Sequence, residues 1–159
     1  MSADLAAFLR DRLDEDERIA AAVLGASWIR HEHVAGVHAD DATPGRPYGT
    51  PVADCRRLPG GYEHGVDIAE HIVRHQPARV VAEIEAKREI VSRYVVALHE
   101  REALRARMRG MLGEGGDAFG QLLEHEHVLI RAAEALAPVV RLLSSPYADH
   151  PEYREEWRP

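Results

Sequence analysis

The fold is decided by residues 65–116, which read GVDIAEHIVRHQPARVVAEIEAKREIVSRYVVALHEREALRARMRGMLGEGG. Asp67 is placed to cap a short helix that runs to His75, and Pro77 suits the first turn of a second helix. Apolar residues then recur every three or four positions, which predicts a long helix over residues 77–112. The stop signal for this helix is a group of glycines, Gly113, Gly115 and Gly116.

A return helix is predicted after these glycines. Asp117 can cap it, and apolar residues at helical spacing continue for seven turns or so, although Pro138 must bend or restart the helix. The loop between the two long helices is short, so they are expected to pack against each other in opposite directions. Region 67–145 is therefore predicted to form an antiparallel helical hairpin.

One charged residue interrupts the apolar seam of the return helix. Glu126 falls in step with Leu122 and Leu129 on the face that should be buried. If the chain turns around Gly115, Arg105 lies opposite Glu126 on the first long helix. We predict an Arg105–Glu126 ion pair across the hairpin, which explains the break in the seam without a functional role.

The first third of the chain has a different pattern. Residues 3–24 have helical periodicity, whereas residues 26–65 contain short strand-like stretches, SWIRHEHVAGVHA and TPVADCRRL, separated by turn-forming residues. A small antiparallel sheet is expected there, and it needs helices to cover it, with Trp28 as the candidate contact. The predicted fold class is α+β, predominantly helical, and residues 1–159 are predicted to form a single domain.

The aromatic C-terminal segment, residues 146–159, ends in YADHPEYREEWRP. A short helix that begins near Pro151 would place Tyr153 and Trp157 four residues apart on one face. We expect these rings, with Tyr147, to dock on the helical core and close it. The alternative is a partner-recognition motif made of the same three residues.

Charge and cysteine content exclude several classes of protein. The formal net charge is −7, from 27 acidic and 20 basic residues, so broad attraction to nucleic acid is absent and such a partner is disfavoured. Cys55 is the only cysteine, which excludes intramolecular disulfides and multi-cysteine zinc sites. No apolar run approaches the length of a membrane span. We expect a cytoplasmic protein that does not contact membranes.

Three segments resemble a known family: LAAFLRDRLDEDERIA, DIAEHIVRHQPARVVAEIEAKREIV and VVRLLSSPYADHPEYREEWRP. The family is a small domain of unknown function from actinobacteria that also occurs in phage and prophage genomes. The closing segment, a PYADHPEYREEWRP-like motif, is the most specific of the three. The resemblance implies no catalytic residues. Many members carry a cysteine-rich stretch before the final motif, suggestive of a metal site, where this chain has EHEHVLIRAAEALAP and no cysteine.

Histidine pairs provide the candidate metal ligands, since ten histidines occur in the chain. His31 and His33 would share one face of a strand, and His71 and His75 would share one side of a helix. Glu124 and His127 have the Glu-x-x-His spacing of di-metal helical bundles. Zinc or another divalent transition metal is the cofactor that these residues would take. Surface or hydrogen-bonded histidines without a metal are the simpler interpretation.

Nucleophilic catalysis has little support in the sequence. No Gly-x-Ser-x-Gly motif and no phosphate-binding glycine loop occur. Arg56 and Arg57 could lower the pKa of the Cys55 thiol, but a half-buried strand cysteine is the favoured interpretation. We therefore assign no catalytic residue.

A non-enzymatic interaction or accessory protein, related to mobile elements, is the leading functional hypothesis. One alternative is a histidine-based metal-binding protein or metal-dependent hydrolase. Another is a nucleic-acid-binding regulator that uses the basic stripe from Arg101 to Arg109. The partner protein is not identified by the sequence, and a homodimer through the amphipathic hairpin is expected.

Overall fold

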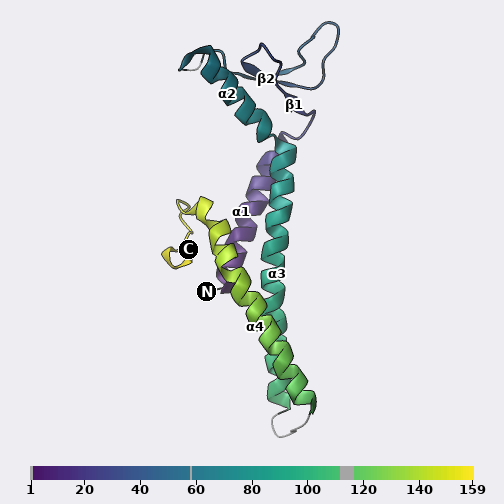
Figure 1. The fold of residues 1–159 in the computed structure, drawn as a ribbon, viewed down its shortest axis with the longest axis vertical. Helices are drawn as coiled ribbons and strands as arrows, with labels where there is room; N and C mark the ends of the chain where they lie inside the picture. Colours follow the sequence, from purple (N-terminus) through teal and green to yellow (C-terminus); the bar gives the residue numbers. More distant parts are fainter. Residues whose placement is uncertain (1, 58, 112–116) are drawn as a thin grey trace. The chain divides into compact units, whose positions relative to one another are not determined.

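Helices account for most of the computed structural model, which describes residues 2–57, 59–111 and 117–159 (Figure 1). The elements found in these residues are α1 (Ser2–Ala22), β1 (Trp28–Ile29), β2 (Gly36–Ala39), β3 (Pro51–Asp54), α2 (Gly61–Arg74), α3 (Pro77–Gly110), α4 (Asp117–Ser144) and the 3₁₀ turns η1 (Ser145–Tyr147) and η2 (Glu155–Trp157). The α+β, predominantly helical fold class is confirmed. Over the same part of the chain, no helix combines the length and apolar character needed to span a membrane.

The chain groups into two compact units. The helical unit comprises Met1–Glu15 and Glu85–Pro159, and the sheet unit comprises Asp16–Ile84. Helices α1 and α3 each contribute residues to both units. The single domain expected from the sequence stays a prediction.

In the helical unit, α3 and α4 form the antiparallel hairpin that the sequence predicts (Figure 1). The helical part of α3 ends at Gly110, two residues before the expected end. The glycines expected to stop it, Gly113, Gly115 and Gly116, lie outside the described residues. Helix α4 continues through Pro138 without a restart. Proline removes only one backbone donor, and packing of Val140, which is fully buried, holds the helix beyond it.

The core of the helical unit lies where α1, α3 and α4 meet. Leu9, Val91 and Val140 are at most 1% exposed. Burying each such side chain stabilises the fold by about 1.5–3 kcal/mol. Phe8 and Trp157 belong to the same cluster, so the two ends of the sequence share one core.

The sheet unit contains three antiparallel strands in the order β1-β2-β3. Ile29 on β1 pairs with His38 on β2, and Val37 pairs with Ala53 on β3. The register shifts between Val37 and His38, which is a β-bulge. Bulges bend a strand and change the direction of the side chains next to them.

Helix α2 begins earlier than the sequence indicates. It starts at Gly61, so Asp67 lies inside the helix and the predicted cap at Asp67 is wrong. Gly60 precedes the helix with φ 103°, a left-handed conformation that glycine adopts without steric cost. Residues 61–65, expected in the β region, therefore belong to α2.

Trp28 contributes to the core of the sheet unit, as predicted. It packs against the buried cluster of Val37, Cys55 and Ala69. Its backbone N–H donates a hydrogen bond of 3.2 Å to Oε1 of Gln76. Helix α2 approaches the end of β3 so closely that a Cβ on Gly65 would collide with the carbonyl oxygen of Cys55. Glycine is therefore required at position 65 for this contact.

Candidate partner-binding groove

The C-terminal segment docks by 3₁₀ turns, and the α-helix predicted from Pro151 does not form. The backbone N–H of Glu152 donates to Nδ1 of His150, a side-chain contact that competes with helical hydrogen bonding. Arg154 is extended, with φ −100° and ψ 135°, and caps the turn that carries Trp157. The segment is therefore ordered by local turns at its beginning and by one 3₁₀ turn at its end.

The aromatic residues of this segment pack around Phe8 on α1. Its ring centroid lies 5.0 Å from that of Trp157, 6.0 Å from Tyr153 and 6.3 Å from Tyr147. Trp157 is only 3% exposed. The three residues proposed for partner binding are thus brought together, and the docking predicted for them on the helical core is confirmed.

A groove of about 570 Å³ runs between the start of α1 and the docked segment. The aromatic residues Phe8, Tyr153 and Trp157 line it, together with Ala7, Pro151 and four charged residues, Asp4, Asp11, Glu152 and Arg154. We call this feature the C-terminal groove. Three carboxylates face one guanidinium in its lining, so the groove has an excess of negative charge.

Arg154 is held in the C-terminal groove by two kinds of contact. Its Nη1 atom donates to Oδ2 of Asp4 over 2.9 Å. Its Cζ atom lies 5.2 Å from the centroid of the Trp157 ring, a cation–π arrangement. The groove therefore binds a guanidinium from its own chain through a carboxylate and an aromatic face.

The histidines predicted as metal ligands come together only in pairs. The ring centroids of His71, on α2, and His75, the residue that follows α2, are 4.4 Å apart. On α4, Nδ1 of His127 lies 4.0 Å from Oε2 of Glu124. Among the described residues, no group of three histidine, cysteine, aspartate or glutamate side chains is arranged to hold a metal ion.

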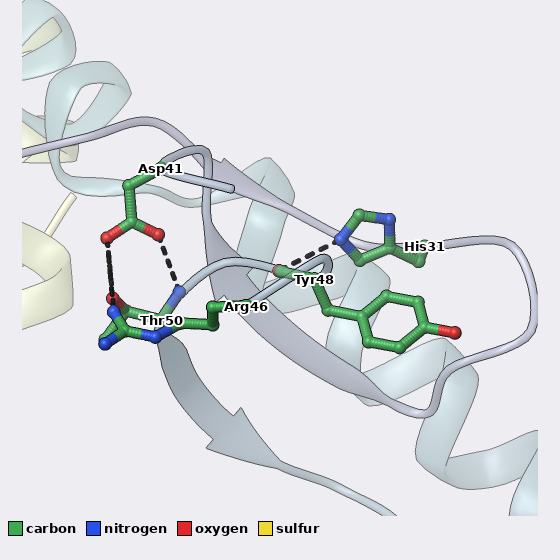
Figure 2. Close-up of polar contacts among 5 residues, drawn as sticks. All are labelled: His31, Asp41, Arg46, Tyr48 and Thr50. Atoms are coloured by element: carbon green, nitrogen blue, oxygen red, sulfur yellow. Dashed lines mark hydrogen bonds and ion pairs between the residues drawn. The ribbon is translucent and has the colours of Figure 1, made fainter. Parts of the chain in front are cut away.

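His31 does not have the neighbour that the sequence suggests. Its ring lies 5.6 Å from that of His38 and 5.1 Å from that of Tyr48, while the expected partner, His33, is exposed. Nε2 of His31 is 3.1 Å from the carbonyl oxygen of Tyr48, as Figure 2 shows. The sequence analysis did not identify His38 as the neighbour of His31, because the pairing of β1 with β2 brings the two residues together. Only the strand register carries that information.

Half of the basic stripe on α3 is neutralised. Arg105 donates a hydrogen bond from Nε to Oε1 of Glu126, and Nε of Arg101 lies 3.8 Å from the same oxygen. The hydrogen bond from Arg105 keeps the pKa of Glu126 below its ordinary value, and the charge of Arg101 adds to this effect. Arg107 and Arg109 remain exposed. The Arg105–Glu126 pair predicted from the sequence is confirmed.

Cys55 follows β3 and is 2% exposed. Burial raises the pKa of its thiol, and the negative charge of Asp54 raises it further. Arg56 does not lower that pKa, because its guanidinium donates two hydrogen bonds to the Asp54 carboxylate, of 2.8 and 2.7 Å. The alternative of a thiol activated by Arg56 and Arg57 is therefore wrong.

The chain belongs to a family of unknown function, DUF6221, which it matches over residues 2–159. The match confirms the resemblance to a domain of unknown function. No curated protein and no solved structure matches the chain. The actinobacterial and phage links that the resemblance implies stay predictions.

Proposed function

We propose that this chain is a non-enzymatic interaction protein that binds an arginine-bearing segment of a partner protein in the C-terminal groove. The proposal rests on the binding of the Arg154 guanidinium in the groove, where it contacts both the carboxylate of Asp4 and the face of the Trp157 ring. A site that holds one guanidinium in this way has the chemistry to hold another. An accessory role in mobile-element-related genes, which the family resemblance implies, is the setting that we propose for it.

The rim of the groove supplies the charge for such a partner. Asp11 and Glu152 are exposed, and both line the groove beside the Asp4–Arg154 pair. Carboxylates at a rim mainly accelerate and steer the encounter with a basic segment, and their effect declines as salt is added. Tyr153, the half-buried ring of the lining, adds apolar contact with the stem of an arginine side chain.

Fluorescence anisotropy tests the proposal with a short labelled peptide made of glycine, serine and arginine. We expect saturable binding by the full chain that weakens as salt is raised. The same peptide with citrulline in place of arginine should bind about tenfold more weakly or less, because it lacks the positive charge. The Arg154→Gln variant should bind the arginine peptide more tightly than the parent chain, since the internal competitor is removed.

Matched variants separate the groove from the overall negative charge of the protein. Asp11→Asn combined with Glu152→Gln should weaken binding, whereas Glu32→Gln combined with Asp40→Asn removes the same charge from exposed positions in the sheet unit. The second pair should leave binding unchanged. Equal binding of the arginine and citrulline peptides, or an equal loss in both pairs of variants, would overturn the proposal.

Metal binding is the second candidate function, and the His71–His75 pair favours it. The two rings lie 4.4 Å apart at the C-terminal end of α2, where His75 caps the helix, and both residues are exposed. Two imidazoles spaced four residues apart on a helix can share a divalent transition metal, with water in the remaining positions. Titration calorimetry with zinc chloride should then show binding that is lost in the double variant His71→Ala, His75→Ala. Replacing the exposed His64 and His99 provides the control.

A further inference from the structure

A cavity of about 300 Å³ opens on the strands of the sheet unit, away from any residue used above for partner binding. Its walls combine an apolar part, which includes Val34 and Pro51, with an aromatic ring, Tyr48, and three polar side chains, His38, Asp54 and Arg56. Small-ligand sites have this composition, with apolar walls and a few convergent polar groups. The volume suits a single-ring molecule.

Among the polar residues that line the cavity, His38 is half-buried, whereas Asp54 and Arg56 are exposed. Its Nδ1 atom is buried and has no hydrogen-bond partner among the described residues. Burial lowers the pKa of the His38 ring, the neighbouring His31 and Arg56 lower it further, and Asp54 opposes them. The ring is therefore neutral near pH 7, with a polar atom that the protein itself does not satisfy. The His38 side chain therefore adds a neutral, polar group to the wall of the cavity.

The strand and the loop around the cavity hold His38 and Tyr48 in fixed places. The β-bulge lies directly at His38, and bulges often re-aim side chains at binding sites. In the loop that carries Tyr48, the Asp41 carboxylate accepts two hydrogen bonds of 2.6 Å from Thr50, one from its N–H and one from its hydroxyl (Figure 2). Arg46 donates to the same hydroxyl over 2.5 Å.

Although these hydrogen bonds hold the loop, Tyr48 itself is 54% exposed. The Tyr48 backbone is also held by His31, whose Nε2 lies 3.1 Å from its carbonyl oxygen. Gly49 follows with φ +77°, and a Cβ there would collide with the carbonyl oxygen of Ala39. Because these contacts already hold the loop in one conformation, a ligand that stacks on the Tyr48 ring loses little free energy to ordering of the loop.

Arg56 supplies the positive charge at the mouth of the cavity. It uses Nε and Nη2 to bind Asp54, which leaves Nη1 for another acceptor. Because Asp54 already occupies two donors and carries its own negative charge, a ligand with a single negative charge fits this position better than a phosphate dianion.

We infer that this cavity is a binding site for a small aromatic carboxylate, with the ring against Tyr48 and Pro51 and the carboxylate near Arg56. The His38 side chain forms part of the wall beside the ligand. The site requires neither a metal nor the C-terminal groove, so it stands independently of the arginine-segment proposal.

Two-dimensional amide NMR of the full chain, titrated with benzoate and nicotinate, tests the inference. We expect saturable shifts with both acids, confined to β2, β3 and residues 46–50. Benzamide, which has the same shape without the charge, should bind about tenfold more weakly. Absence of saturable shifts with both acids at millimolar concentration would overturn the inference, as would equal binding of benzamide.

Two pairs of variants locate the site. Arg56→Gln should weaken benzoate binding about tenfold, whereas Arg57→Gln, which removes the same charge from the next residue, should not. Tyr48→Ala should weaken binding, whereas Tyr62→Ala, at a tyrosine 51% exposed on α2, should not. All four side chains are exposed, so the variants should remain folded, and melting curves check this. Equal effects within either pair would contradict the assigned site.

Discussion

Arg105 on α3 donates a hydrogen bond from its Nε atom to Oε1 of Glu126 on α4. Glu126 is only 9% exposed and occupies a position that the helical pattern reserves for an apolar residue. Arg101 lies 3.8 Å from the same carboxylate oxygen. A nearly buried carboxylate is therefore compensated by two arginines that both keep access to solvent.

The two halves of this pair should differ in their importance for stability. We expect Arg105→Leu to lower the melting temperature by several degrees more than Glu126→Leu. Removing the arginine leaves a buried charge poorly paired, whereas removing the carboxylate leaves an arginine that can turn to solvent. Thermal unfolding of both single variants and of the double variant measures this. The double variant should recover most of the loss, and strict additivity of the two changes would contradict the coupling.

Acid should destabilise the protein through carboxylates that are hydrogen-bonded in the fold. The hydroxyl of Thr50 holds the pKa of Asp41 below its ordinary value, and Arg56 does the same for Asp54. A folded-state pKa below the unfolded one means that the stabilisation is fully present at neutral pH and is lost as pH falls below about 5. Melting temperatures recorded between neutral and acidic pH should show this decline.

The Asp41→Asn variant is the check on that assignment. It should melt at a lower temperature than the parent at neutral pH, and its loss of stability on acidification should be smaller. A variant with an unchanged acid profile would show that Asp41 has no part in the decline.

Trp157 should be a major source of stability in the helical unit. The side chain is 3% exposed and its ring centroid lies 5.0 Å from that of Phe8. Trp157→Ala should cost about 3–5 kcal/mol of unfolding free energy, as for other buried aromatic residues. Deleting residues 147–159 should lower the melting temperature by many degrees. Truncation of Arg158 and Pro159 alone, both exposed, should have little effect.

Cys55 should be inert in the folded protein. Its thiol is buried and its pKa is raised by that burial, so little thiolate forms near neutral pH. Ellman's reagent should label the native protein slowly and the protein in denaturant quickly. Equal labelling rates in the two conditions would show that the thiol is accessible in the fold.

The homodimer expected from the amphipathic hairpin stays a prediction, and α4 offers a surface for it. Val128 and Leu142 are 49% and 58% exposed. Burying such side chains in a symmetric interface is favourable, so we expect light scattering to give the mass of a dimer. Val128→Glu and Leu142→Glu should shift the mass to that of a monomer. Val96→Glu, at a 48% exposed position on α3, is the matched control.

The helical hairpin could be predicted because its signals are local in sequence. Helical periodicity located α3 and α4, and the break at Glu126 was sufficient to predict its pair with Arg105. The start of α2 was predicted at Asp67, although it lies at Gly61, because a glycine with φ 103° at Gly60 replaces the usual side-chain cap. Nothing in a one-dimensional pattern indicates that backbone conformation.

The candidate sites depended on contacts that no local sequence pattern indicates. The aromatic residues Tyr153 and Trp157 were predicted to dock, but Phe8 as their partner and Asp4 as the partner of Arg154 were not. The approach of His38 to His31 and Tyr48 follows from strand register and a β-bulge.

By itself, the sequence determined the long helices α3 and α4, their antiparallel hairpin and the ion pair inside it, because apolar spacing and the charge that interrupts it act over a few helical turns. The tertiary structure alone decided which side chains form the C-terminal groove and the cavity at His38. The groove joins the two ends of the sequence by long-range packing, and the cavity forms within residues 34–56 because strand register folds that stretch onto itself.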